Sequence, residues 1–123
     1  MPNYIITAED FLYRRFPIMD EPRFQVFFEI KDGKKVPTSA AFKTKPGEDG
    51  LSVDIKALTT PEISVIDAAN YGLAEIPASS PLGLGYPCTH NPQPGNNAHA
   101  LIVGDTNPIA KKLKKAITNV ITF

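Results

Sequence analysis

The two histidines, His90 and His99, are the residues best suited to proton transfer in this sequence, because imidazole titrates near neutral pH. Each is a candidate acid–base catalyst. The adjacent arginines Arg14 and Arg15 could supply a cation, since the planar guanidinium group grips phosphate or carboxylate. A histidine acid–base group combined with such an anion clamp would suit chemistry on a phosphate-bearing substrate.

The same residues also have plain structural interpretations. His99 shares one face of an expected strand with Leu101 and Val103, which suits a histidine in the core. Arg14 and Arg15 would be favourable at the C-terminal end of a short helix, where the helix dipole attracts positive charge. Both interpretations stay open at the level of sequence.

Ser52 and Asp54 form a further polar pair on one face of an expected strand. They are candidates for supporting polar groups in the same site. No histidine follows them at a recognisable spacing, so a Ser-His-Asp arrangement would require long-range folding.

A metal site would have to draw on Cys88, His90, His99 and Asp105. The Cys-x-His spacing places both side chains on one face of an extended chain. The additional cysteines or histidines of a metal site are missing, and the sequence contains no P-loop, GxGxxG, CxxC or HExxH motif. We therefore interpret these residues as incidental neighbours and expect no metal and no cofactor.

Residues 76–104 contain no Asp, Glu, Lys or Arg. A solvent-exposed connection normally carries charge, so this segment is expected to pack against something. It either covers the protein's own core or forms a surface covered by a partner. In the second case Leu82, Leu84 and Tyr86 would be the interface residues.

The composition describes one globular domain, 1–123, with 42% hydrophobic and 21% charged residues. Thirteen basic residues balance 13 acidic ones, which argues against nucleic-acid partners and against adhesion to a membrane. The single cysteine cannot form an internal disulfide, and no apolar leader segment is present. These features predict a cytoplasmic protein.

The elements that must position the candidate residues begin with an ambiguous segment. Thr7-Ala8-Glu9-Asp10 is typical of a helix start and predicts a short helix that ends before Pro17. A strand over residues 11–16 is the alternative. Alternation over residues 23–30 predicts a strand, in which Phe27 is an aromatic exception on the polar face.

Asp32-Gly33 predicts a tight hairpin turn that leads to a partner strand over about 36–42. A strand over 51–55 would complete a three-stranded meander. The remaining expected elements are a helix from Thr60 to about Gly72, strands over 73–76 and 98–103, and a last helix from Thr106 to about Asn119 with its lysines outward. The expected fold is α+β, a mostly antiparallel sheet of four or five strands with two or three helices packed on one face.

Several short segments resemble those of a group of small, single-domain bacterial proteins: Tyr13-Arg14-Arg15, Ser39-Ala40-Ala41-Phe42, Leu51-Ser52-Val53-Asp54 and Asn97-Ala98-His99-Ala100. The resemblance implies a bacterial-like origin and an intact domain, and it implies no activity. An arginine near a strand, followed by a serine-bearing strand, also looks loosely like ADP-ribosyltransferase-type enzymes. The one candidate here for the partner glutamate of that group is Glu75.

Two functions are compatible with these observations. The first is a binding or accessory module that contacts a protein partner, or its own copy, through residues 76–104. The alternative is a small enzyme or nucleotide-binding protein that acts on a phosphate-bearing substrate. There His99 or His90 would be the acid–base group, Arg14 and Arg15 the anion clamp, and Ser52 with Asp54 the supporting polar groups.

Overall fold

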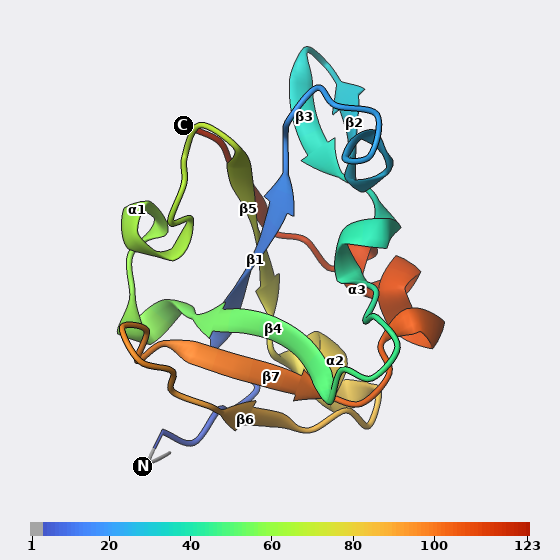
Figure 1. The fold of residues 1–123 in the computed structure, drawn as a ribbon. Helices are drawn as coiled ribbons and strands as arrows, with labels where there is room; N and C mark the ends of the chain where they lie inside the picture. The colour runs from blue at the N-terminus through green and yellow to red at the C-terminus, as the bar shows by residue number, and fades with distance from the viewer. Residues whose placement is uncertain (1–3) are drawn as a thin grey trace.

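The structure is a computed structural model that describes residues 4–123. Its main feature is a six-stranded antiparallel sheet in the order β6-β7-β4-β1-β5-β8, beside a separate β2-β3 hairpin (Figure 1). The strands are β1 (Phe11–Pro17), β2 (Phe28–Lys31), β3 (Lys34–Pro37), β4 (Gly50–Ile55), β5 (Tyr71–Pro77), β6 (Cys88–His90), β7 (His99–Val103) and β8 (Asn119–Ile121).

The large sheet consists of two well-paired halves joined by a short ladder. Strand β1 pairs with β5 over its whole length, and β4 pairs with β7 over five residue pairs. Between the halves, β1 and β4 pair only at Leu12↔Ile55 and Tyr13↔Asp54. Figure 1 shows β4 and β7 running across the direction of β1 and β5. The two central strands therefore part just after Tyr13.

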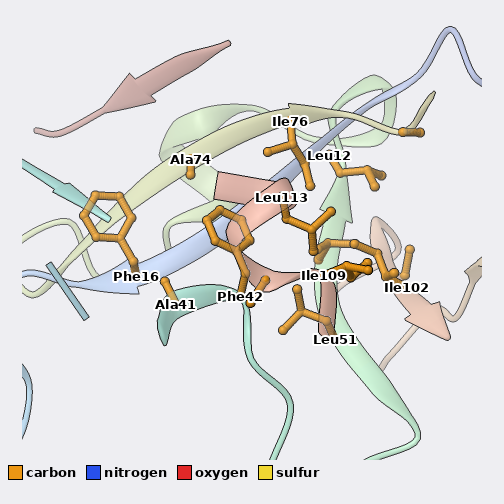
Figure 2. Close-up of a cluster of buried hydrophobic side chains, with 14 of the residues drawn as sticks. Leu12, Phe16, Ala41, Phe42, Leu51, Ala74, Ile76, Ile102, Ile109 and Leu113 are labelled. Atoms are coloured by element: carbon orange, nitrogen blue, oxygen red, sulfur yellow. The ribbon is translucent and has the colours of Figure 1, made fainter. Parts of the chain in front are cut away.

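The main hydrophobic core lies on one face of this sheet. Alternate residues of the strands point into it, as expected for strands with one buried face. Figure 2 shows Leu113 and Phe42 packed over side chains from several strands. The largest fully buried side chains of this core include Leu12, Phe16, Phe42, Leu51, Ile55, Ile76, Ile102 and Leu113.

The helices are short: α1 (Pro61–Ser64), α2 (Ser79–Gly83) and α3 (Ala110–Lys115). The expected fold, a sheet of four or five strands covered by two or three helices, is therefore wrong. Residues 4–123 form six strands in one sheet, two in another and one helix of more than five residues. Among residues 4–123, no helix combines the length and the apolar character needed to span a bilayer.

The N-terminal helix prediction is wrong, and the alternative strand is confirmed. The helix signal at Thr7 produces only a turn, in which Asp10 N–H donates to the Thr7 carbonyl at 3.1 Å. Residues 11–17 are extended because β4 and β5 both offer backbone partners, and because Leu12 and Phe16 enter the core at strand spacing.

The hairpin turn is confirmed, but its flanking elements differ from the prediction. Asp32 and Gly33 both have positive φ, 53° and 76°, as a tight hairpin turn requires. Residues 25–27 and 39–42 are 3-10 turns rather than strand, because Ala41 and Phe42 leave the hairpin to enter the core. The expected meander does not form, since β4 pairs with β1 and β7 instead.

Later elements were predicted with mixed success. The strands over 51–55, 73–76 and 98–103 are confirmed as β4, β5 and β7. The helix at Thr60 has the expected cap, with Ile63 N–H donating to the Thr60 hydroxyl at 3.3 Å. It ends at Ser64, and Ile66 then adopts a left-handed φ of 65° that no helix can continue. The last helix ends at Lys115, because residues 119–121 pair with β5 as strand β8.

Candidate functional site

The structure brings five candidate residues from distant parts of the sequence together at one small hollow in the sheet. These are Arg14, Arg15, Ser52, Asp54 and His99, which line it with Tyr13 and Val53. They come from β1, β4 and β7. The hollow has a volume of about 10 Å³, enough for roughly one water-sized group.

Strand register explains why these residues meet. Tyr13 pairs with Asp54, and Asp54 in turn pairs with His99, so the three lie side by side on the face opposite the main core. Arg15 and Ser52 follow at alternate positions on the same face. The meeting depends on pairings between three strands that are far apart in sequence.

Arg14 comes from the core side of β1 and fills the opening where β1 and β4 part. Its Nε–H donates to the Ala41 carbonyl at 2.7 Å, and its Nη1 donates to the Ser52 carbonyl at 2.9 Å. These two bonds hold the guanidinium group in a fixed orientation. Its remaining N–H groups make no hydrogen bond to residues 4–123.

The charge of Arg14 is poorly compensated. Burial, and then the neighbouring charge of Arg15, lower the pKa of Arg14 to about 10. Within the part of the chain that the structure describes, no carboxylate forms an ion pair with Arg14. The nearby charge of Glu48 acts in the opposite direction on this pKa without forming an ion pair. A partly buried cation without an ion-pair partner is a favourable place for an anionic ligand.

Arg15 is held at the rim of the hollow by Asp54 and α1. Its Nη1 donates to the Ser64 carbonyl at 2.9 Å and lies 3.8 Å from Asp54 Oδ2. The buried Asp54 carboxylate also accepts the Ser64 hydroxyl at 2.6 Å and the Asn96 amide at 2.9 Å. Both oxygens of Asp54 are thus used by neighbouring side chains. We therefore interpret Asp54 as a residue that positions those neighbours.

His99 presents one unused ring nitrogen. Its Nδ1 lies 2.8 Å from the Asn91 carbonyl, and a carbonyl can only accept, so Nδ1 carries the proton. In the neutral ring Nε2 is then an unprotonated acceptor, and it makes no hydrogen bond within residues 4–123. A base must have such a nitrogen available.

His90 has the opposite character. It is buried, its Nδ1 accepts the Tyr4 N–H at 3.2 Å, and its Nε2 lies 2.6 Å from the Asn97 carbonyl. Both ring nitrogens are therefore used to join the N-terminal segment to the loop before β7. Of the two histidines, only His99 lines the hollow.

Two hydroxyl groups complete the lining. Ser52 lies diagonally across from His99 on the same face of β4 and β7. Tyr13, which sequence reasoning did not place in the site, lies between Asp54 and Glu75 in the sheet, and burial raises the pKa of its phenol. Its period-two spacing from Arg15 would have indicated it once residues 11–17 were taken as a strand.

Glu75, the candidate glutamate of the ADP-ribosyltransferase resemblance, is directed elsewhere. Its carboxylate is buried and lies 3.2 Å from Lys56 Nζ. It belongs to the strand next to Tyr13 and is not among the described residues that line the hollow.

An open groove of about 650 Å³ adjoins the hollow and shares Arg14 and Arg15 with it. We call it the aromatic–basic groove. Its other lining residues are Pro17, Phe24, Val26, Phe27, Ala40, Lys43, Thr44, Lys45, Glu48 and Tyr71. Sequence reasoning missed it; its one visible sign was Phe27, an aromatic side chain in an otherwise polar position.

The residues considered as metal ligands have other roles. Burial raises the pKa of the Cys88 thiol to about 11. Asp105 accepts the Thr44 hydroxyl at 2.9 Å and the Asn107 N–H at 3.0 Å. Within residues 4–123 no group of three or more His, Cys, Asp or Glu side chains is placed to hold a metal ion.

Leu82, Leu84 and Tyr86 are partly buried and pack against the main core. The Tyr86 hydroxyl donates to the Asp105 carbonyl at 2.8 Å. In this structure the charge-free segment 76–104 therefore uses these side chains within its own chain. Their role in an interface stays a prediction.

Comparisons of the chain with models of protein families, with curated proteins and with solved structures gave no match. The geometry of the hollow is therefore the basis on which a function can be argued.

Proposed function

We propose that the protein binds a small phosphate-bearing ligand at the hollow, with Arg14 and Arg15 as the anion clamp and His99 as the acid–base group. The observation that carries this proposal is the guanidinium of Arg14, held by two backbone carbonyls and without a carboxylate partner among the described residues. Arg15 lines the same hollow, and so does His99, whose Nε2 makes no hydrogen bond to the described residues.

The clamp is preorganised for an anion. The backbone bonds of Arg14 fix its orientation before any ligand arrives, so little side-chain freedom is lost on binding. Charge-assisted hydrogen bonds from guanidinium to phosphate are about twice as strong as neutral ones. The small size of the hollow suits phosphate oxygens at its mouth, with the rest of the ligand outside.

His99 would supply proton transfer. Its Nε2 can take a proton from water or a hydroxyl group and return it to a leaving oxygen, as hydrolysis or transfer at a phosphoester requires. The Asn91 carbonyl would hold the ring in the correct tautomer and stabilise the imidazolium that forms. Ser52 would offer a hydroxyl hydrogen bond to the ligand.

The test is a thermal-shift titration with pyrophosphate at low salt, on the wild type and three variants. A ligand present at 100 times its Kd stabilises the fold by about 2.7 kcal/mol, which raises Tm by several degrees. We expect that shift in the wild type and in His99→Gln, because the clamp is intact in both. Arg14→Lys should lose most of it, because lysine lacks the planar fork.

Lys111→Gln is the matched control, since it removes an exposed cation on α3. It should keep the full shift. An equal shift in Arg14→Lys and the wild type, or a loss in Lys111→Gln as large as in Arg14→Lys, would refute binding at the hollow.

A further inference from the structure

The aromatic–basic groove continues the hollow outward. Arg14 and Arg15 line both, so a ligand whose phosphate is held by the arginines must place its remaining atoms in this groove or in solvent. The groove volume of about 650 Å³ lies within the range of roughly 300–1,000 Å³ that small-molecule sites occupy. The groove is thus large enough for a complete small ligand.

The charge of the groove favours an anion. Lys43 and Lys45 lie in it with the two arginines, and Glu48 is the one acidic side chain among the described residues that line it. The whole chain has a net charge of zero, so this concentration of cations is local. The two lysines add two further positive charges to the lining that Arg14 and Arg15 share.

Besides its basic residues, the groove is lined by aromatic side chains. Phe24, Phe27 and Tyr71 line it, each partly exposed, and Val26 beside them is 59% exposed. Aromatic side chains next to a cationic region are the usual platform on which a nucleobase stacks. A sugar phosphate would leave these rings unused.

Hydrogen bonds from Thr38 hold the turn that carries Phe27 in position. Thr38 N–H donates to the Phe27 carbonyl at 3.0 Å, and the Thr38 hydroxyl donates to the Val26 carbonyl. These bonds tie the 3-10 turn at residues 25–27 to the segment that carries Ala41, whose carbonyl holds Arg14. The turn that carries Phe27 and the side chain of Arg14 are therefore both held by the segment from Thr38 to Ala41.

We propose that the ligand is a nucleoside phosphate, with its phosphate at Arg14 and Arg15 and its base stacked on Phe27 and its aromatic neighbours in the groove. This inference rests on the proposed phosphate site and names the class of compound it takes.

The experiment is isothermal titration calorimetry with ribose 5-phosphate and, separately, with AMP, GMP, CMP and UMP. At least one nucleotide should bind ten times more tightly than ribose 5-phosphate, because only a nucleotide can stack. Phe27→Ala should remove that advantage and leave ribose 5-phosphate binding unchanged. Phe123→Ala, which truncates an exposed phenylalanine outside the groove lining, should change neither.

The outcomes separate the two proposals. If ribose 5-phosphate binds and no nucleotide binds more tightly, the phosphate site stands and the nucleotide inference is overturned. If none of the five compounds binds, both fail. Should Phe27→Ala not fold, Phe27→Leu keeps the side-chain bulk without the stacking plane, and it must weaken nucleotide binding for the inference to hold.

Discussion

At the scale of single residues, hydrogen bonding separates two histidines that sequence alone treats alike. His90 uses both ring nitrogens inside the fold, and His99 uses only Nδ1. The pairing of Tyr13 with Asp54 and of Asp54 with His99 then brings the available His99 nitrogen to the arginines. His99 is distinguished as the candidate by the hydrogen-bond partner that its Nε2 lacks among the described residues.

This difference predicts unequal effects on stability. His90→Ala leaves the Tyr4 N–H and the Asn97 carbonyl without their partner and should lower the free energy of unfolding by about 2–3 kcal/mol. His99→Gln loses one hydrogen bond at a partly exposed position and should cost less than about 1 kcal/mol. Urea unfolding measures both values. Equal costs would mean that His99 is a structural histidine too.

The Cys88 thiol gives a prediction about pH. Burial raises its pKa from 9.0 to about 11, so near pH 8 the folded protein should contain about a hundredfold less thiolate than the unfolded chain. Reaction with a thiol reagent at pH 8 should be correspondingly slow in the native protein and fast in urea. Similar rates in both states would contradict this.

The raised pKa of Cys88 also makes the free energy of unfolding depend on pH. The unfolded chain loses the thiol proton first, so between pH 9 and 11 it binds fewer protons than the folded chain and stability falls as pH rises. Cys88→Ser should lack this contribution to the pH dependence, which makes it the control for the thiol.

At the scale of elements, the site depends on the close pairing of β4 with β7. A Cβ atom on Gly50 would overlap the carbonyl oxygen of Ile102 and approach Val103 Cα to 3.0 Å. Gly50→Ala should therefore lower the free energy of unfolding by about 1–3 kcal/mol, because the two strands must move apart.

Gly83→Ala is the matched control. Nothing lies within 4 Å of a Cβ built at Gly83, so this change should alter stability by less than about 0.5 kcal/mol. Denaturant unfolding compares the two variants. A neutral Gly50→Ala would show that β4 and β7 are not so closely apposed.

Elements with strong local signals could be predicted from the sequence. The Asp32-Gly33 turn, the Thr60 cap and strands β4, β5 and β7 follow from turn chemistry and from the pattern of apolar residues. Strand β1 could be given only as the alternative, because the helix-start residues at Thr7 are a local signal for a helix. Pairing with two distant strands outweighs that signal.

The same division holds for the site. His99, Arg14, Arg15, Ser52 and Asp54 could be selected by residue type, since each has chemistry of its own. That they meet depends on register between distant strands, which no local spacing encodes. Phe24 and Lys43 of the aromatic–basic groove come from separate connections and Tyr71 from the start of β5, so they carry no shared pattern.

At the scale of the whole molecule, the parting of the two sheet halves creates the place for the Arg14 side chain. A continuous ladder between β1 and β4 would pair the Ser52 carbonyl with backbone, and that carbonyl instead accepts from Arg14. The described residues that line the hollow and its adjoining groove include four cations of this neutral chain, Arg14, Arg15, Lys43 and Lys45, against the two carboxylates of Asp54 and Glu48. Such a concentration of charge attracts anions more strongly than the net charge indicates.

The most direct test of the phosphate site is an NMR titration with pyrophosphate that follows the arginine Nε–H signals and the backbone amides. We predict that the Nε–H signals of Arg14 and Arg15 and the amides of Ser52 and His99 shift together and reach saturation. Movement confined to the exposed lysines of α3, with both arginine signals unchanged, would contradict the account.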